Sequence, residues 1–306
     1  MYNYEKSIHG GDRLEVMKNR IQHLIEALPY IKEFKGKIFV IKYGGSIMED
    51  ESGKKALIQD IVLLSHLGIK CIVVHGGGKE INSRLERLGI ESEFKEGYRV
   101  TSSEAIDEVE MVLTGRINKE LTCSLNNAGA KAVGLNGKDA GLLRSVQKYV
   151  EIDNEVHDIG HVGEIQEVNP EIVEILLANG IVPVISPIGF DDTGTTFNIN
   201  ADDVAAEVSA KLNAEKLIMI TDVPGVMRDL DDEDSLISKM TFSDVDTLQE
   251  EGVISGGMIP KMNCVKKAIQ SGAKSVHILN GKVEHCVMLE IFTDSGIGTM
   301  ISREEL

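Results

Sequence analysis

Two glycine clusters follow apolar, strand-like segments of this chain and contain the first residues that could do chemistry. They are Lys42-Tyr43-Gly44-Gly45-Ser46 and His75-Gly76-Gly77-Gly78-Lys79. In a parallel sheet the carboxyl ends of the strands open onto a ligand crevice. Glycines at that edge let backbone N–H groups approach an anion, and the N-terminus of the next helix adds a positive field. One cluster alone would indicate only a tight turn, but the two together predict an anion site with two halves.

Charged and amide side chains occur at the end of the first strand and at the starts of two helices. Lys42 ends its strand directly before glycines, which favours a cation in the crevice over a solvated edge lysine. Lys261 begins a helix, where a cation opposes the helix dipole unless an anion lies nearby. Asn198, Asn200 and Asp202 stand together at another helix start. N-capping explains only one of these three polar groups.

Arg99 lies between a polar segment and the start of a helix. Its planar guanidinium can bind a carboxylate through two parallel hydrogen bonds. The alternative is a surface ion pair, which the residue type alone does not exclude.

Several common site types are absent from the sequence. Gly137-Lys138 resembles the end of a P-loop, but Asp139 replaces the required Ser or Thr, and Ala132 stands where the first glycine is needed. Neither glycine cluster has the GxGxxG spacing of a dinucleotide fold, and HExxH and GxSxG do not occur.

The elements that position these residues alternate along the chain. Apolar segments of strand length occupy 37–42, 70–75, 131–135, 181–188, 217–221 and 275–279, and helical patterns follow the first two at 52–67 and from 79. Short β-branched runs separated by helices indicate a parallel sheet buried on both faces. The predicted fold class is α/β, a three-layer helix–sheet–helix sandwich around a central, mainly parallel sheet.

Three further segments have a different character. Residues 90–99 and 143–168 are more polar and alternating, which predicts antiparallel hairpins at an edge or lid. Residues 228–235 hold five acids and one base, which predicts a solvated loop. A change in composition near 189–194 indicates a boundary between two halves.

An apolar stripe precedes the first core strand. Its members recur at three- and four-residue spacing, which predicts one helical face: Leu14, Met17, Ile21, Leu24, Ile25 and Leu28. Packing on its own domain and packing on another subunit fit the stripe equally well.

Composition limits the class of protein. The 306 residues carry a formal net charge of −17 and 42% hydrophobic residues, so the chain can build a core but repels nucleic acid. No apolar stretch approaches the roughly 20 residues of a membrane span. The four cysteines form no CxxC pair, which predicts small buried hydrophobes kept reduced and no zinc site. The N-terminus has no apolar signal core, so a cytoplasmic protein is expected.

Eight motifs follow one another in the order found in a known protein family: KYGGS, HGGGKEIN, GYRVT, GRINKEL, NINADD, TDVPGV, GGMIPKM and TDSGIGTM. From residue 37 to the C-terminus the chain resembles the acetylglutamate kinases of the amino-acid kinase family. The resemblance implies the amino-acid kinase fold and phosphorylation of the side-chain carboxylate of N-acetyl-L-glutamate, with ATP and Mg²⁺, in arginine biosynthesis.

The resemblance also implies a role for each site residue. Lys42 and Lys261 are expected to stabilise the transferring phosphoryl group, and Asp202 to orient both lysines. The expected acceptor-binding residues are Gly77, Gly78, Arg99, Asn198 and Asn200, and the expected ATP-binding residues are Gly44, Gly45, Thr221 and Asp222. No protein metal ligand is expected, because Mg²⁺ is commonly held by substrate phosphates and water.

Regulation and assembly follow from the same resemblance. Residues 1–35 are expected to be an oligomerisation helix, 36–190 an acetylglutamate-binding and dimerisation lobe, and 191–306 an ATP-binding lobe. A helix before the first strand implies a hexamer, a trimer of dimers, that L-arginine inhibits. The expected arginine site comprises Lys216, Glu290, Gly296 and Gly298. The alternative is that Glu290 is a solvated helix residue.

The chemistry of the acceptor agrees with these roles. A γ-carboxylate, with an ordinary pKa of about 4.3, is ionised at neutral pH and needs no general base. The difficulty is to bring an anion against a triphosphate, which requires local cations and backbone donors. The alternatives are a related kinase acting on carbamate, glutamate, aspartate, a nucleoside monophosphate or acetylaminoadipate, and a non-catalytic metabolite sensor.

Overall fold

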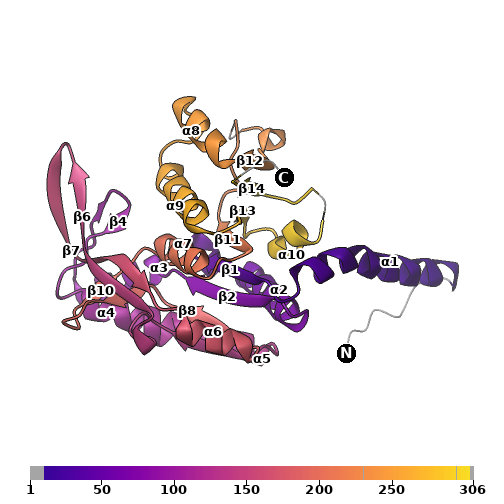
Figure 1. Cartoon of the computed structure of the whole chain (residues 1–306), viewed down its shortest axis with the longest axis horizontal. Coiled ribbons are helices and arrows are strands. Elements are labelled where there is room, and N and C mark those ends of the chain that lie inside the picture. Colours follow the sequence, from indigo (N-terminus) through magenta and orange to yellow (C-terminus); the bar gives the residue numbers. More distant parts are fainter. Residues whose placement is uncertain (1–9, 230, 294, 304–306) are drawn as a thin grey trace.

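A central eight-stranded sheet organises the chain (Figure 1). The structure, a computed structural model, describes residues 10–229, 231–293 and 295–303. The strand order is β12 (Lys239–Thr241), β14 (Thr299–Ser302), β13 (Ser275–Asn280), β11 (Lys216–Thr221), β1 (Ile38–Tyr43), β2 (Lys70–His75), β8 (Val182–Ile185) and β5 (Ala132–Leu135). Only the β13–β14 pair in this sheet is antiparallel.

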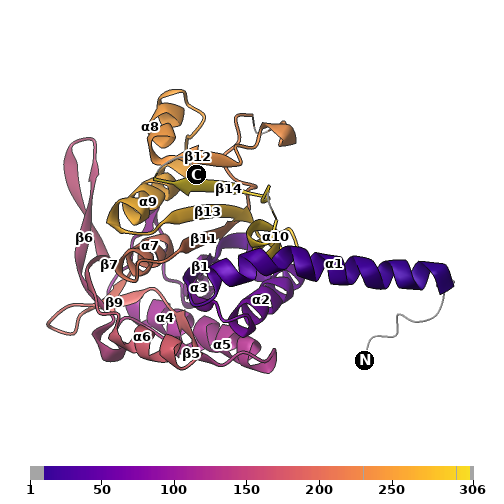
Figure 2. The ribbon, with the colours of Figure 1, turned by 45° about the vertical axis from the view of Figure 1, so that its right-hand side comes forward.

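Helices lie on both faces of the sheet, and one further helix, α1 (Gly10–Phe34), extends away from it (Figure 2). The structure describes ten α-helices. They are α1, α2 (Glu51–His66), α3 (Gly78–Leu88), α4 (Ile106–Glu110), α5 (Asn118–Asn127), α6 (Glu171–Ala178), α7 (Ala201–Lys211), α8 (Phe242–Glu250), α9 (Met258–Ser271) and α10 (Cys286–Ile291), with short 3₁₀ turns and a π-helical turn (Met111–Ile117) between α4 and α5. The predicted three-layer α/β sandwich with a mainly parallel sheet is confirmed.

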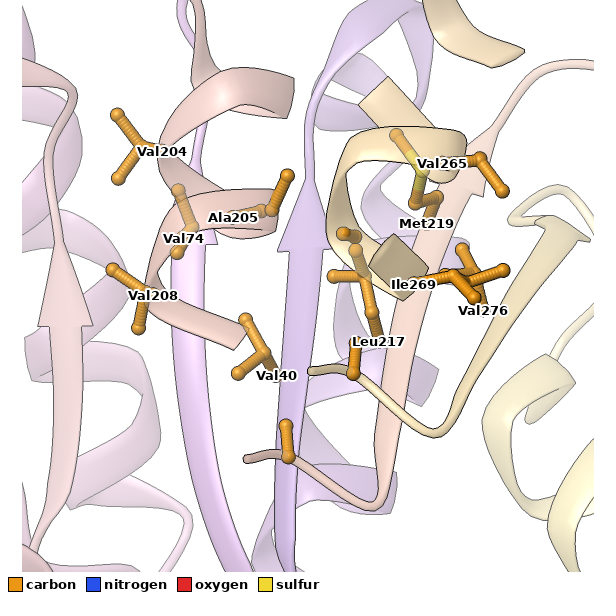
Figure 3. Packing of buried hydrophobic residues seen from close by; sticks show 14 of the residues in the cluster. Val40, Val74, Val204, Ala205, Val208, Leu217, Met219, Val265, Ile269 and Val276 are labelled. Atoms are coloured by element: carbon orange, nitrogen blue, oxygen red, sulfur yellow. The ribbon is translucent and has the colours of Figure 1, made fainter. Parts of the chain in front are cut away.

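Successive residues of each central strand enter different cores. Val40 lies in one buried cluster with residues of α7 and α9, whereas its neighbours Phe39 and Ile41 lie in another with residues of α2, α5 and α10. Figure 3 shows α7 and α9 packed side by side over the strands on the first face. This period-two burial explains why the strands read as continuous apolar runs.

One predicted strand is wrong in extent. The segment 181–188 divides into β8 and a separate strand β9 (Ile188–Phe190) that joins a different sheet. Pro187 lies at the break and has no N–H to continue the ladder of β8. The chain therefore leaves the central sheet there, beside the carboxyl end of the strand.

The predicted polar hairpins are confirmed. Strands β6 (Leu143–Ile152) and β7 (Glu155–Val168) pair antiparallel and form a small closed sheet with β9 and β10 (Thr196–Asn198). The tip of the β6–β7 hairpin projects from the body (Figure 1). A shorter hairpin of β3 (Phe94–Lys95) and β4 (Tyr98–Arg99) carries Arg99.

Helix α1 projects away from the globular body (Figure 2). The six residues of its apolar stripe are exposed, with Leu24 at 67%, so packing of the stripe on its own domain is wrong. The base of the helix does pack: the Phe34 ring lies 5.4 Å from that of Phe39, and Tyr30 lies 6.3 Å from Phe292. Residues 1–9 of the expected oligomerisation segment lie outside the described residues.

The acidic segment 228–235 agrees with the predicted solvated loop. Its residues 228, 229, 231, 232 and 234 are exposed.

All four cysteines are free, but Cys123 is exposed, so the prediction that each cysteine is a buried hydrophobe is wrong for Cys123. Cys123 lies on the outer face of α5, whereas Leu121 and Leu125 face the core. Across the described ranges, no helix is both long and apolar enough to cross a membrane.

Candidate active site

Two lysines and an aspartate form an ion cluster at the carboxyl edge of the sheet. Lys42 Nζ lies 2.8 Å from Asp202 Oδ1, and Lys261 Nζ lies 3.5 Å from Asp202 Oδ2. Lys42 comes from the central strand β1, Asp202 from the first turn of α7, and Lys261 from the first turn of α9. Strand β1 lies between β11 and β2, and the Lys42 side chain is only 12% exposed. The alternative interpretation of Lys42 as a solvated edge lysine is therefore wrong.

Asp202 is not the cap of its helix. The Asn200 side chain caps α7 by accepting a hydrogen bond from the Asp202 N–H, at 2.9 Å. The Asp202 carboxylate is therefore free to bind the lysines. Burial opposes its charged form, but Lys42 and Lys261 outweigh burial and hold the pKa of Asp202 below its ordinary value. At neutral pH the carboxylate is therefore ionised and holds the Lys42 and Lys261 side chains in position.

We expect Asp202→Asn to lower kcat on the order of 10²-fold, because small misplacements of reacting groups cost about that much. Folding should persist, since Asn200 remains the cap. Steady-state kinetics and a thermal melt check this. The matched control is Glu207→Gln, which removes a different α7–α9 ion pair, with Lys267 at 2.7 Å, and should leave kcat intact. A large loss of melting temperature with normal kcat would instead assign Asp202 a structural role.

The two glycine clusters lie side by side next to this ion cluster. The Gly76 N–H donates a hydrogen bond to Tyr43 O at 2.8 Å. A Cβ placed on Gly44 would lie 3.2 Å from Lys42 Nζ and 3.5 Å from Gly76 Cα. Gly45 has a φ of +81°, which favours glycine. The structure thus brings the two predicted halves of the anion site together.

The second cluster presents unpaired backbone donors. Helix α3 begins after Gly77 without a side-chain cap, and in the described part of the chain neither the Gly77 nor the Gly78 N–H donates a hydrogen bond. A Cβ on Gly77 would lie 2.4 Å from Ile117 Cδ1, so a side chain here would have to displace residues of the π-helical turn. Free N–H groups at a helix start bind anions.

Arg99 is buried, and its guanidinium is held by neutral groups. Its guanidinium donates to Asn82 Oδ1 at 2.6 Å, to Ser92 Oγ, and to Gly78 O at 2.9 Å. It also lies 4.7 Å from the centre of the Phe94 ring. Burial lowers the pKa of Arg99 to about 10, which still leaves it charged at neutral pH. No carboxylate of the described residues forms an ion pair with Arg99, so the alternative interpretation of Arg99 as part of a surface ion pair is wrong. The buried charge can instead bind an anionic ligand.

One cavity of about 170 Å³ is lined by all five residues expected to bind the acceptor: Gly77, Gly78, Arg99, Asn198 and Asn200. Asn198 is oriented by a hydrogen bond to Thr101 Oγ1 at 3.2 Å. The rest of the wall is largely apolar and includes Ile81, Leu113 and Val162. The cavity therefore combines a cation, amide donors and an apolar wall.

The two remaining nucleotide candidates end the neighbouring strand. Thr221 ends β11, which pairs with β1, so it lies on the same edge of the sheet as Lys42. It is buried, and its hydroxyl donates to Val223 O at 2.9 Å. Asp222 follows and is exposed. Neither residue lines the cavity that contains Arg99.

Two residues that orient Arg99 were not predicted from the sequence. Asn82 and Ser92 hold Arg99 in place, and Asn82 was detectable because it lies four residues after Gly78, on the same face of α3. Ser92 lies in a loop and carried no comparable signal.

A second polar cluster lies at the opposite, amino end of β11. His277 joins two predicted residues: its Nε2 lies 3.1 Å from Lys216 Nζ, and its Nδ1 lies 2.7 Å from Glu290 Oε1. Glu290 Oε2 accepts from the N–H groups of Ile297 and Gly298, at 2.8 and 3.1 Å. The Glu290 side chain is 5% exposed, so the alternative of a solvated helix residue is wrong.

The same cluster touches the base of α1 and a glycine turn. Lys216 Nζ lies 5.1 Å from the centre of the Phe34 ring. Gly296 has a φ of +62° and approaches Glu290 so closely that a Cβ would lie 2.7 Å from Oε2. Asp294, in the same C-terminal stretch, lies outside the described residues. The structure thus brings Lys216, Glu290 and both predicted glycines together.

The donor set fits a nucleotide whose phosphates bring their own metal ion. Among the described residues, no three His, Cys, Asp or Glu side chains are grouped to hold a metal. Cations and glycine backbone, by contrast, lie together where Lys42, Gly44 and Lys261 meet. Mg²⁺ commonly keeps water and substrate phosphates as ligands, so it would be held mainly by the nucleotide.

Comparison with known proteins gives a consistent set of relatives. Residues 37–280 match the amino acid kinase family. The chain is 49% identical over 300 residues to acetylglutamate kinase of Methanocaldococcus jannaschii, covering 96% of this chain and 100% of the relative. It is 50% identical over 285 residues to that of Thermoanaerobacter pseudethanolicus, covering 93% and 94%.

A solved structure is also similar over most of the chain. N-acetylglutamate synthase from Neisseria gonorrhoeae, complexed with coenzyme A and N-acetyl-glutamate, superposes with a TM-score of 0.82 at 26% identity, covering 94% of this chain. The complex with coenzyme A and L-arginine gives a TM-score of 0.78 at 26% identity, covering 93% of this chain. This chain spans 64% and 65% of the two synthase chains.

Proposed function

The chain belongs to the amino acid kinase family and is a phosphotransferase, and we propose that it transfers the γ-phosphoryl group of ATP to the side-chain carboxylate of N-acetyl-L-glutamate in arginine biosynthesis. The observation that carries this proposal is the buried Arg99, which has no carboxylate partner among the described residues. It lines a cavity with Gly77 and Gly78, whose N–H groups have no acceptor in the same part of the chain. The acetylglutamate kinases to which the chain is about half identical support the same substrate.

In the proposed reaction, each site residue has a specific role. Arg99 binds the α-carboxylate of the acceptor, and the N–H groups of Gly77 and Gly78 bind its reacting end beside the ion cluster. Lys42 and Lys261 approach the transferring phosphoryl group from two sides, and Asp202 aims both of them. The acceptor carboxylate is already ionised, so no side chain has to remove a proton.

The nucleotide occupies the other side of the ion cluster. Gly44 and Gly45 border its phosphates, and Thr221 and Asp222 lie near it at the end of β11. Bound Mg²⁺ would neutralise part of the phosphate charge. Residues 191–306 supply most of this nucleotide lobe and 36–190 most of the acceptor lobe, although Asn198 and Asn200 extend into the acceptor cavity from the second half.

An acceptor panel tests the substrate. ADP release should be fastest with N-acetyl-L-glutamate and slow with glutamate, aspartate, carbamate or a nucleoside monophosphate, because only an acylated amino dicarboxylate fills both the Arg99 end and the apolar wall. N-acetyl-L-aminoadipate, one methylene longer, is the closest competitor. A faster rate with it would assign the enzyme to that acceptor, and no turnover with any acceptor would indicate a metabolite sensor.

We also propose that L-arginine inhibits the enzyme at the cluster of Lys216, His277 and Glu290. A buried carboxylate and the glycine turn at 296–298 can hold a guanidinium and an ammonium, while Lys216 meets the effector's carboxylate. The similar synthase complexed with L-arginine supports an arginine site in this fold. The cluster lies at the opposite end of β11 from the phosphoryl site, so arginine acts by shifting a two-state equilibrium.

The exposed stripe of α1 supports assembly into a hexamer. Six large apolar side chains on a projecting helix are exposed, and such patches mark interfaces. We propose that pairs of α1 helices join three dimers. The base of α1 touches Lys216 through Phe34, which would couple assembly to arginine binding.

Deleting residues 1–28, which keeps Tyr30 and Phe34, is expected to convert hexamers into dimers that still phosphorylate acetylglutamate. The arginine concentration for half-inhibition should rise about tenfold, a coupling of ordinary size. Sedimentation velocity and inhibition curves measure both effects. The control, Glu290→Gln, should lose arginine inhibition while remaining hexameric. A full-length protein that sediments as a dimer and ignores millimolar arginine contradicts both proposals.

A further inference from the structure

A buried histidine lies directly behind the acceptor cavity and has no part in the chemistry described above. His75 ends β2, is fully buried, and lies with its Nδ1 2.8 Å from Gly76 O and its Nε2 3.2 Å from Asn118 Nδ2. Burial lowers the pKa of His75 to about 4, with Lys119 contributing, so the ring is neutral at physiological pH.

Asn118 determines which ring nitrogen carries the proton. Its Nδ2 donates to Val184 O at 2.8 Å, and its Oδ1 accepts from Lys119 Nζ at 3.3 Å, which fixes the orientation of the amide. Since the amide nitrogen can only donate, Nε2 of His75 must accept. The proton of the neutral ring therefore lies on Nδ1, and His75 donates to Gly76 O.

Strand β5 is adapted to this contact. A Cβ placed on Gly134 would lie 1.8 Å from Asn118 Oδ1, so a side chain at this strand position would displace the amide. Glycine weakens a strand and often marks a close approach. The buried pair of His75 and Asn118 is thus accommodated by the sheet on both sides, at β8 through Val184 and at β5 through Gly134.

The hydrogen bond to Gly76 O has a direct geometric consequence. The carbonyl of Gly76 and the N–H of Gly77 belong to one planar trans peptide, in which they point in opposite directions. Holding the carbonyl toward the buried ring therefore aims the Gly77 N–H away from it. Gly76 and Gly77 both line the acceptor cavity, and this N–H has no acceptor among the described residues.

We propose that His75 is a positioning residue that sets acceptor affinity by locking the Gly76–Gly77 peptide, so that the Gly77 N–H faces the acceptor's carboxylate. The proposal rests on the proposed function, because it takes that carboxylate as the ligand of Gly77. The flanking glycines alone leave the peptide free to rotate. The imidazole, held by Asn118, removes that freedom before the acceptor binds.

Two amide substitutions of His75 test which ring nitrogen has to donate the hydrogen bond. His75→Asn places an amide N–H near Nδ1 and should keep the KM for acetylglutamate close to the wild-type value. His75→Gln carries its amide near Nε2, cannot donate to Gly76 O, and should raise that KM about 10- to 100-fold, the range for a lost hydrogen bond to a charged group. The KM for ATP should stay unchanged in both. The control is His66→Gln, which removes the same type of Nδ1 contact to a carbonyl, Val62 O at 2.8 Å, on the exposed face of α2.

A spectroscopic readout does not depend on folding of the variants or on activity. In ¹⁵N NMR of the wild-type protein, His75 should show the Nδ1–H tautomer and should not titrate between pH 5 and 8. An Nε2–H tautomer, titration in that range, or a normal KM in a folded His75→Gln enzyme overturns the proposal. If wild-type protein fails to phosphorylate acetylglutamate while His75 shows the expected tautomer, the proposed function fails instead.

Discussion

Replacing Lys42 by alanine is expected to lower kcat by about 10²–10³-fold while acetylglutamate binding stays mostly intact. The Lys42 ammonium lies against Asp202 and beside Gly44. Under the proposed function this is where the phosphoryl group transfers and where Lys42 stabilises its negative charge in the transition state. Removing one preorganised donor from such a site costs about this much. Lys261→Ala should behave alike, because Lys261 holds the other oxygen of the same carboxylate. Steady-state kinetics and calorimetric binding of acetylglutamate separate the two effects.

Two matched variants separate charge from packing and from position. Lys42→Met keeps the aliphatic stem and should be as slow as Lys42→Ala. Lys37→Ala removes a half-exposed lysine just before the same strand, paired with Glu215 at 3.4 Å, and should leave kcat unchanged. Normal kcat in Lys42→Met would show that the ammonium group takes no part in phosphoryl transfer.

Replacing Arg99 by lysine should mainly raise the KM for acetylglutamate. Lysine keeps the charge but loses the planar fork that Asn82, Ser92 and Gly78 O hold in place. Losing a buried, hydrogen-bonded charge pair costs roughly 2–5 kcal/mol. The KM for ATP should remain normal, since Arg99 lies in the acceptor cavity.

The control for this variant is another arginine stacked on a phenylalanine. Arg144 lies 4.4 Å from the centre of the Phe190 ring and pairs with the exposed Asp192 outside the cavity. Arg144→Lys should change neither KM. A rise in the KM for ATP on Arg99→Lys would place Arg99 with the nucleotide.

Features encoded by local pattern could be predicted from the sequence. The glycine clusters, Lys42 and the parallel strands follow from short-range rules about strand ends and β-branched runs. The split before Pro187 could not be predicted from proline alone, because Pro183 lies inside β8 and is paired with β5.

Features that depend on tertiary burial could not be predicted. The exposure of the α1 stripe and of Cys123, and the burial of Glu290, depend on what other segments cover. His277 joins Lys216 to Glu290 only because β11, β13 and α10 meet. Likewise, the tautomer of His75 follows from Asn118, 43 residues away along the chain.

Identifying the group that the enzyme phosphorylates tests the proposed reaction. The enzyme, MgATP and N-acetyl-L-glutamate are incubated with hydroxylamine, which traps an acyl phosphate as a hydroxamate, and the product is identified by mass spectrometry. We expect the hydroxamate at the γ-carboxylate, formed in a one-to-one ratio with ADP and nearly abolished in Lys42→Ala. ADP release without hydroxamate, or a hydroxamate at the α-carboxylate, would contradict the placement of Arg99 and the two lysines in this site.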